Sequence, residues 1–200
     1  SRITQKIICF PGNGGTSKFA TNIQVDVNDF KEILKLIKFY KIQLVIVGPE
    51  DPLVGGIVDF LKKNKVKVFG PNKFAAKLEG SKAFMKRICL QNNIPTAKFK
   101  ICREKSQVIK FLNHCKLPIV VKADGLAAGK GVTICTTKKK VLKVSSEIFK
   151  GKYKSSKKLI LEEFLEGEEA SYFLIVDNHS YKFFGTAQDH KRVRENDKGP

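Results

Sequence analysis

The sequence predicts an α/β protein whose amino-terminal part is built on a parallel sheet. Short apolar runs at 6–10, 43–47 and 66–69 have the length of buried strands. Helical periodicity fills the intervals, with one helix beginning after Asp29 and another over 55–63. Loops rich in glycine and proline follow the strands. This alternation is typical of a Rossmann-like parallel sheet with helices on its faces.

Two loops of this region are candidates for a ligand site. Pro11, Gly12 and Asn13 follow the first strand, and Glu50 follows the second. Right-handed crossovers place both loops at the carboxyl edge of the sheet, where such folds bind ligands. The alternative is that the glycine and proline residues only form turns and that Glu50 is solvated. The sequence has no G-x-G-x-x-G, so a dinucleotide is not indicated.

A second region follows a helical stretch at 73–92, in which Ser81 can cap a helix. Ile94-Pro95-Thr96 ends that stretch and places a domain boundary near residue 97. Strands and helices then alternate in a small separate unit. Its expected elements are strands at 98–102, 118–121, 132–135 and 158–164 and helices at 106–114 and 137–150, before a β segment at 170–176 and its hairpin partner at 181–184.

The hairpin between 118 and 135 is the most informative stretch. Lys122 ends its first strand, and the loop that follows contains Lys130 and three glycines, Gly125, Gly129 and Gly131. Glycine lets backbone N–H groups approach phosphate oxygens, and the two ammonium groups supply positive charge. The loop is not a P-loop, because glycine replaces the final Ser or Thr and a strand follows instead of a helix. The sequence therefore predicts a hairpin that covers phosphate; the alternative is a lysine-rich surface loop.

Composition limits the remaining possibilities. A net charge of +19 over 200 residues is compatible with a polyanion partner, but the excess is mostly lysine spread along the chain, which disfavours nucleic acid. No apolar run reaches the ~18 residues that a membrane span needs. Five scattered cysteines without C-x-x-C spacing fit free thiols in a reducing cytoplasm and disfavour zinc.

Six motifs occur in an order that resembles one enzyme family. Their sequences are PGNGGT (11–16), GPEDPL (48–53), EGSK (79–82), IVVKADGLAAGKGV (119–132), LEEFLEGEEAS (161–171) and QDHKRV (188–193). Together they resemble the glycinamide ribonucleotide synthetase family of ATP-grasp ligases, over essentially all of the chain. The hairpin and the glutamate-rich segment indicate only an ATP-grasp fold, whereas the other motifs are specific to this family.

The resemblance implies an ATP site. Lys82 and Lys122 would be the paired lysines that touch the phosphates, and the loop Gly125–Gly131, with Lys130, would be the lid over the triphosphate. Lys122 and Lys130 are also the candidate catalytic cations, since catalysis would consist of positioning and charge neutralisation.

The same resemblance assigns the nucleoside half of ATP. Glu162, together with the backbone of Glu163 and Leu165, would form the adenine hinge. Glu169 would bind the ribose, because a carboxylate can accept bonds from two vicinal hydroxyls.

The implied reaction joins glycine to 5-phosphoribosylamine in purine biosynthesis. ATP would phosphorylate the glycine carboxylate, and the amine would then attack the glycyl phosphate and release phosphate. Pro11, Gly12, Asn13 and Glu50 would face the phosphoribosylamine, and Asp189 and Lys191 the glycine.

The resemblance also predicts domain organisation. We expect a pre-ATP-grasp domain at 1–97 that lacks its first strand, a lid subdomain at 98–167 and the start of the large ATP-grasp subdomain at 168–200. The Mg²⁺ or Mn²⁺ ligands of the family would lie beyond Pro200. We therefore expect the 200-residue chain alone to have no ligase activity.

Four alternatives stay open at this point. They are another ATP-grasp carboxylate–amine ligase, a subunit of a biotin-dependent carboxylase, a non-catalytic polyanion-binding module, and a fusion of this ligase with later purine-pathway domains.

Overall fold

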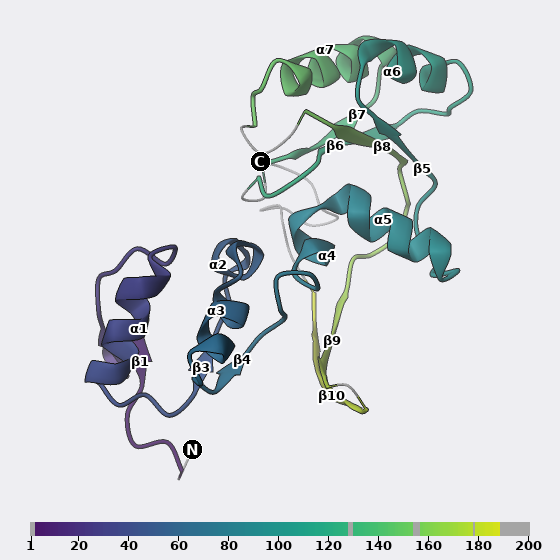
Figure 1. Cartoon of the computed structure of the whole chain (residues 1–200). Coiled ribbons are helices and arrows are strands. Elements are labelled where there is room, and N and C mark those ends of the chain that lie inside the picture. The colour runs from purple at the N-terminus through teal and green to yellow at the C-terminus, as the bar shows by residue number, and fades with distance from the viewer. Residues whose placement is uncertain (1–2, 128–129, 154–156, 178, 189–200) are drawn as a thin grey trace. The chain divides into compact units, whose positions relative to one another are not determined.

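The computed structural model describes residues 3–127, 130–153, 157–177 and 179–188 (Figure 1). The chain forms two compact units, Ser1–Phe164 and Leu165–Pro200, which are described separately below. The predicted Gly129, Asp189 and Lys191 lie outside the described residues.

Two pairs of short parallel strands form the sheet part of the amino-terminal region. β1 (Ile8–Cys9) pairs with β2 (Thr21–Asn22), and β3 (Val45–Ile46) pairs with β4 (Val68–Phe69). The prediction of parallel pairing is confirmed. The sequence did not indicate β2, because its two residues are polar and show no apolar periodicity. The strands are also shorter than the apolar runs that predicted them.

The helices of this region begin at residues whose chemistry favours helix starts. The Asp29 side chain accepts a hydrogen bond from the Glu32 N–H and so caps α1 (Phe30–Phe39), as predicted. The sequence analysis placed Glu50 in the loop after the second strand. That prediction is wrong, because α2 (Glu50–Gly55) already begins at Glu50. Acidic side chains in its first turn interact favourably with the helix dipole. Gly56, at φ 100°, separates α2 from α3 (Ile57–Lys63), which corresponds to the helix expected over 55–63.

One apolar cluster stabilises these elements. The faces of α1, α2 and α3 meet there at spacings of three and four residues, as the periodicity predicted. Its buried members are Ile33, Ile37, Leu53, Ile57, Val58, Leu61 and Ala76.

The helical stretch at 73–92 forms α4 (Lys77–Gly80) and α5 (Lys82–Gln91), which are separated at Ser81. Ser81 has an extended backbone, and its hydroxyl accepts a hydrogen bond from the Phe84 N–H. The predicted cap is therefore confirmed, and it sets the position of Lys82 as the first residue of α5.

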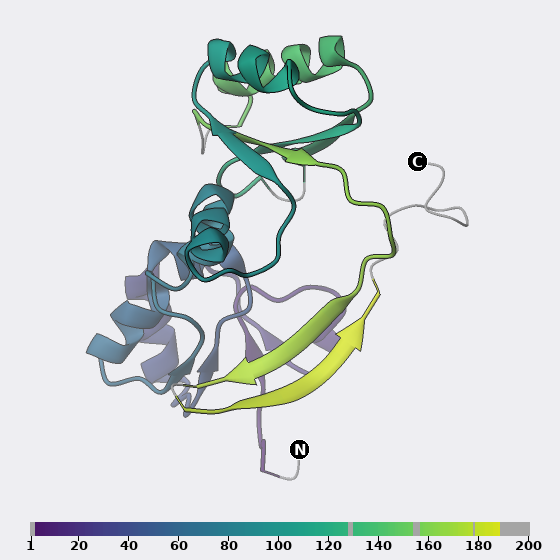
Figure 2. The same ribbon diagram turned by 90° about the vertical axis from the view of Figure 1, so that its right-hand side faces the viewer.

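A four-stranded antiparallel sheet lies in the second half of the first unit. Its strand order is β5 (Phe99–Cys102), β8 (Leu159–Glu163), β6 (Ile119–Ala123) and β7 (Val132–Cys135). The predicted hairpin is confirmed as the pair β6–β7. Two helices, α6 (Lys105–Leu112) and α7 (Lys138–Phe149), cover one face of the sheet (Figure 2).

The two faces of this sheet differ in chemistry because side chains alternate along each strand. On the face toward α6 and α7, Ile119, Val121 and Ala123 of β6 pack with Leu159 and Leu161 of β8 in a second apolar cluster. The other face therefore receives the intervening residues of both strands, including Lys122 and Glu162. The polar part of the candidate site is built on this face.

The second unit is an antiparallel hairpin of β9 (Ser171–Val176) and β10 (Tyr181–Ala187), as predicted. Its register shifts between Phe183 and Gly185. Several of its large apolar side chains, including Tyr172 and Phe184, are exposed.

Within the described part of the chain, no helix is long and apolar enough to cross a membrane. All five cysteines are free thiols.

Leu61 and Leu90 form a matched pair for testing the amino-terminal core, because both lie near the end of a helix but only Leu61 is fully buried. Leu61→Ala should lower the free energy of unfolding by about 3 kcal/mol through lost burial and a residual cavity. Leu90→Ala should change it by less than about 0.5 kcal/mol. Equilibrium urea unfolding measures both values, and equal losses would contradict the assignment of this core.

Candidate functional site

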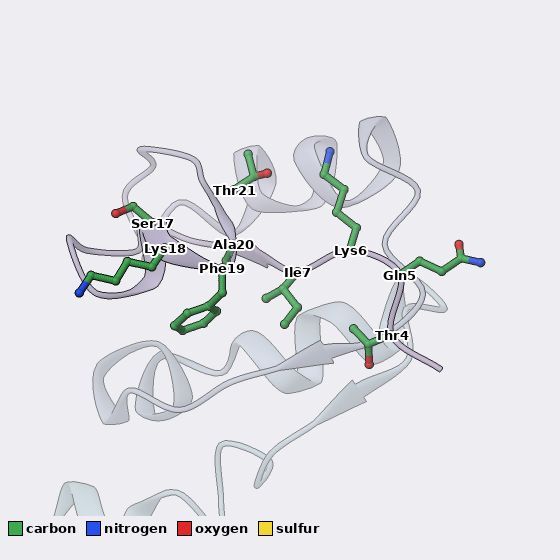
Figure 3. Close-up of a pocket in the computed structure, with 9 residues that line it drawn as sticks. All are labelled: Thr4, Gln5, Lys6, Ile7, Ser17, Lys18, Phe19, Ala20 and Thr21. Atoms are coloured by element: carbon green, nitrogen blue, oxygen red, sulfur yellow. The ribbon is translucent and has the colours of Figure 1, made fainter. Parts of the chain in front are cut away.

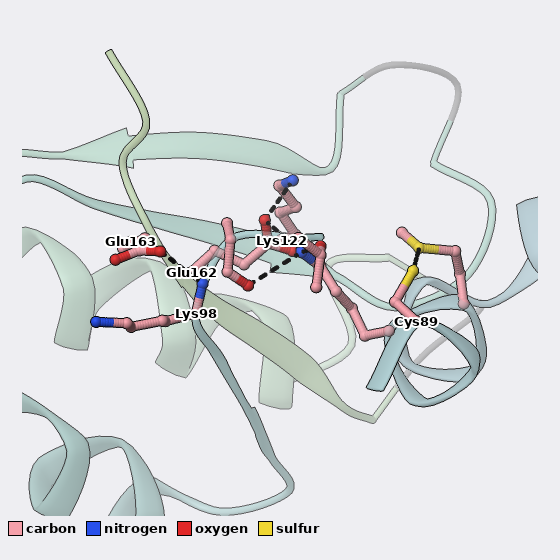
Figure 4. Close-up of polar contacts among 9 residues, drawn as sticks. Cys89, Lys98, Lys122, Glu162 and Glu163 are labelled. Atoms are coloured by element: carbon pink, nitrogen blue, oxygen red, sulfur yellow. Dashed lines mark hydrogen bonds and ion pairs between the residues drawn. The ribbon is translucent and has the colours of Figure 1, made fainter. Parts of the chain in front are cut away.

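Lys122 and Glu162 meet on the polar face of the sheet. Val120 of β6 is directly opposite Glu162 of β8 in the antiparallel register, so Lys122, two residues along, is the diagonal neighbour of Glu162 on the same face. The Lys122 Nζ lies 2.8 Å from the Glu162 Oε2 (Figure 4). The Lys122 side chain keeps 28% exposure, whereas that of Glu162 keeps 5%. The cation is therefore accessible, while its carboxylate partner is buried.

A second lysine approaches the same carboxylate from helix α5. The Nζ of Lys86 lies 3.3 Å from the Glu162 Oε2. It also donates to the Thr96 Oγ1 at 2.6 Å and to the Ala97 carbonyl at 3.5 Å. Lys86 is only 3% exposed, and a charge at such a position is normally found paired and hydrogen-bonded. Two of its three donors are hydrogen-bonded to these neutral oxygens, and the Glu162 carboxylate supplies the counter-charge.

One oxygen of this cluster remains unsatisfied. The Glu162 Oε1 is buried and has no hydrogen-bond partner among the residues that the structure describes. A buried acceptor without a donor is costly, and such exceptions usually have a functional reason. The Glu162 carboxylate therefore keeps one acceptor oxygen without a partner inside the described part of the protein.

Asp124 connects the start of α5 to the end of β6. This carboxylate is 4% exposed, and its Oδ1 accepts from the Ala83 N–H at 3.0 Å and from the Ser81 hydroxyl at 3.1 Å. The Lys158 Nζ lies 3.5 Å from its other oxygen. Together, Asp124 and Ser81 satisfy two backbone N–H groups that a helix start leaves without an intrahelical partner.

Lys82 is positioned by the same junction. Its Nζ donates to the Gly125 carbonyl at 2.8 Å, at the start of the glycine-rich loop. Burial lowers the pKa of Lys82, and the charge of Asp124 opposes that shift. Lys82 thus contacts the chain at Gly125, three residues after Lys122. These are the two lysines that the sequence analysis paired as phosphate contacts.

The described part of the glycine-rich loop folds on itself. The Lys130 N–H donates to the Ala127 carbonyl at 2.9 Å, and the Tyr153 hydroxyl donates to the Lys130 carbonyl at 2.6 Å. A Cβ at Gly131 would lie 2.6 Å from the Ala127 Cβ, so this position excludes any other residue without a backbone shift. The Lys130 side chain is exposed.

The other predicted residues after Glu162 fall into two groups. The Glu163 side chain accepts from the Lys98 N–H at 2.7 Å and so closes the end of the β5–β8 pair (Figure 4). Leu165 and Glu169 belong to the second unit, where both are exposed.

The loop at Asn13 is held by its own hydrogen bonds. The Asn13 Oδ1 accepts from the N–H groups of Gly15 and Thr16, and a short 3₁₀ helix, η1 (Thr16–Lys18), follows. Gly12 has a positive φ, and a Cβ there would overlap the Asn22 side chain. Pro11 is partly exposed.

Glu50 is exposed at the first turn of α2. A surface hollow of about 430 Å³ lies elsewhere (Figure 3) and contains none of the predicted site residues. It is lined by Thr4, Gln5, Lys6, Ile7, Ser17, Lys18, Phe19, Ala20 and Thr21. A shared pocket for Asn13 and Glu50 therefore stays a prediction.

Among the residues with described positions, no group of three or more His, Cys, Asp or Glu side chains could hold a metal ion. The carboxylates of the site, Glu162 and Asp124, are instead paired with lysines.

The fold of this chain is also found in a biotin carboxylase domain. The biotin carboxylase domain of the 2-oxoglutarate carboxylase from Hydrogenobacter thermophilus, solved with MgADP, ADP and bicarbonate, superimposes with a TM-score of 0.74. The match covers 96% of this chain and 46% of that chain at 16% sequence identity, so it shows the fold alone.

Two family models divide the chain between them. Residues 1–79 match the N domain of phosphoribosylglycinamide synthetase, and residues 80–200 match its ATP-grasp (A) domain. The chain is thus an ATP-grasp protein by class. More particularly, it belongs to the phosphoribosylglycinamide synthetase family, and the family resemblance noted from the motifs is confirmed.

Individual relatives agree with this assignment. The phosphoribosylamine–glycine ligase of Mesorhizobium japonicum is 42% identical over 201 residues, which cover 100% of this chain and 47% of the relative. The crystal structure of the Thermotoga maritima phosphoribosylamine–glycine ligase matches with a TM-score of 0.81 and 29% identity, covering 100% of this chain and 48% of that one. The chain spans about half the length of the curated relatives it matches.

Lys86 and Asp124 are the site residues that sequence reasoning missed. The motif IVVKADGLAAGKGV contains Asp124, but nothing in its spacing distinguishes a helix-capping carboxylate from a loop residue. Lys86 occurs in an apolar helical segment, between Met85 and the polar Arg87. No sequence signal distinguished it from an exposed helical lysine, although a lysine is rarely buried without a partner.

Replacing Asp124 by alanine should lower the free energy of unfolding by about 1–3 kcal/mol, because the buried Ala83 N–H loses its acceptor. Hydrogen–deuterium exchange in the first turn of α5 should also accelerate. Asp29→Ala is the control, since it removes an exposed cap from α1 at a cost of about 1 kcal/mol and should leave exchange in α5 unchanged. Unaltered exchange in the Asp124 variant would contradict the proposed junction.

Proposed function

We propose that the full-length protein joins glycine to 5-phosphoribosylamine in an ATP-dependent reaction that yields glycinamide ribonucleotide, ADP and phosphate. The observation that carries the proposal is the placement of two lysines around the end of β6: Lys122 pairs with the buried Glu162 carboxylate, and Lys82 donates to the Gly125 carbonyl at the start of the glycine-rich loop. Membership of the phosphoribosylglycinamide synthetase family supports the choice of these substrates.

In this proposal, the lysines hold the triphosphate. Lys82, Lys122 and the exposed Lys130 neutralise phosphate charge, and the loop Gly125–Gly131 offers backbone N–H groups at close range. Lys122 and Lys130 continue to act as negative charge develops during phosphoryl transfer, which is the main contribution that a protein makes to such a step. ATP supplies the phosphoryl group that activates glycine as glycyl phosphate.

The nucleoside is assigned to the end of β8 and the following segment. The exocyclic amine of adenine is a hydrogen-bond donor and would pair with the Glu162 Oε1 once a movement of the site exposes this buried oxygen. The backbone of Glu163 and Leu165 would complete the adenine hinge, and Glu169 would bind the ribose hydroxyls.

The substrate-side assignments rest on the family motifs. Pro11, Gly12, Asn13 and Glu50 would contact phosphoribosylamine, while Asp189 and Lys191 would contact glycine or its acyl phosphate. The divalent ion, Mg²⁺ or Mn²⁺, would be held by residues outside this chain.

We propose a domain division into 1–97, 98–167 and 168–200, which the two separate apolar clusters of the first unit favour at its first boundary. The free thiols fit a reducing compartment, and we propose the cytoplasm as the location.

Phosphate release by the full-length protein, with ATP and defined acceptor pairs, tests the proposal. We expect turnover with glycine plus phosphoribosylamine and none when bicarbonate replaces glycine. Turnover with bicarbonate alone would instead indicate a carboxylase, and absence of turnover with any pair would contradict the ligase assignment.

Lys122→Met should lower kcat/KM for ATP by about 100-fold, because a charge that stabilises the transition state is removed. Lys100→Met is the matched control: Lys100 is an exposed lysine of the neighbouring strand β5, and its replacement should change kcat/KM by less than about 2-fold. Equal effects of the two replacements would show that general surface charge, not a specific contact, accounts for nucleotide binding.

A further inference from the structure

The Glu162 carboxylate faces two lysines with different surroundings. Lys122 is partly exposed, and among the described residues its Nζ donates to the Glu162 Oε2 at 2.8 Å. Lys86 is buried, and Thr96 and the Ala97 carbonyl hold its Nζ in addition to Glu162. Only Lys122 is therefore placed to leave the carboxylate and reach a ligand.

If Lys122 moves to a phosphate, the Glu162 carboxylate must remain charged in a site from which water is nearly excluded. Removing one partner from a buried ion pair is strongly unfavourable, because the charge that stays behind loses its compensation. Lys86 provides that compensation, since its Nζ stays 3.3 Å from the shared oxygen and is anchored independently. The Phe99 ring, whose centroid lies 5.3 Å from the Lys86 Nζ, further stabilises the cation.

We propose that Lys86 is a positioning residue for nucleotide binding: it is the permanent counter-ion of Glu162, and it thereby frees Lys122 to exchange from that carboxylate to a phosphate. This inference rests on the proposed function, because it requires that Lys122 binds phosphate. Lys86 itself contacts no nucleotide in this scheme.

The arrangement has a measurable consequence that a purely structural role lacks. Without Lys86, Glu162 retains Lys122 as its last counter-ion, so binding becomes weaker for ligands whose phosphates must attract Lys122. Adenosine has no phosphate, so its binding does not require Lys122 to leave Glu162. The effect of Lys86 should therefore depend on the phosphates and should require Lys122.

Isothermal titration of the full-length protein with ATP, ADP, AMP and adenosine tests this inference in a double-mutant cycle of Lys86→Met and Lys122→Met. We expect Lys86→Met to weaken ATP binding by about 10-fold and adenosine binding by less than about 2-fold. In the Lys122→Met background, the additional replacement of Lys86 should change ATP affinity by less than about 2-fold. Arg87→Met, an exposed neighbour on α5, should leave all four affinities unchanged.

An equal loss of ATP and adenosine binding in Lys86→Met, or an undiminished loss in the Lys122→Met background, overturns the inference. If Lys122→Met alone leaves ATP affinity unchanged, the proposed role of Lys122 fails first, so the two failures are distinguishable. If Lys86→Met does not fold, Thr96→Val supplies the test, because it removes only the 2.6 Å anchor of the Lys86 Nζ. Thr96→Val should also weaken ATP binding more than adenosine binding, by a smaller factor than Lys86→Met. An equal loss of affinity for all four ligands in Thr96→Val would overturn the inference.

Discussion

The Glu162 carboxylate lies between two ammonium groups, and most of the candidate site depends on that arrangement. A buried carboxylate is unfavourable unless it is paired and hydrogen-bonded. Lys86 and Lys122 supply the pairing from different elements, a helix and a neighbouring strand. Because the two partners must meet at one oxygen, this interaction fixes helix α5 against the polar face of the sheet.

Asp124 makes the second connection between the same two elements. It caps the first turn of α5 through the Ala83 N–H and continues directly from β6 into the glycine-rich loop. Lys82, the first residue of α5, donates to the Gly125 carbonyl at the start of that loop. Two buried carboxylates, Asp124 and Glu162, thus position Lys82 at the start of α5 and Lys122 on β6.

The face of the four-stranded sheet toward α6 and α7 is apolar and forms a hydrophobic core. Val121 and Leu161 pack toward α6 and α7, and their burial leaves the alternate residues of the same strands on the polar face. One strand therefore contributes to stability and to the site at once. The amino-terminal region has its own core around Leu61 and Val58, to which Leu53 of α2, the helix that begins at Glu50, contributes.

The sequence by itself determined the family, the hairpin of Lys122, the Ser81 cap and most helices and strands, because these depend on local periodicity, capping chemistry and ordered motifs. It placed Glu50 in a loop, although an acidic pair favours a helix start. It did not indicate β2, whose two polar residues carry no periodic signal. Only the tertiary structure decided that Glu162 pairs with Lys86 and Lys122 and that Asp124 caps α5. Those partners are separated by dozens of residues, and strand register and helix packing, which no local pattern encodes, bring their side chains together.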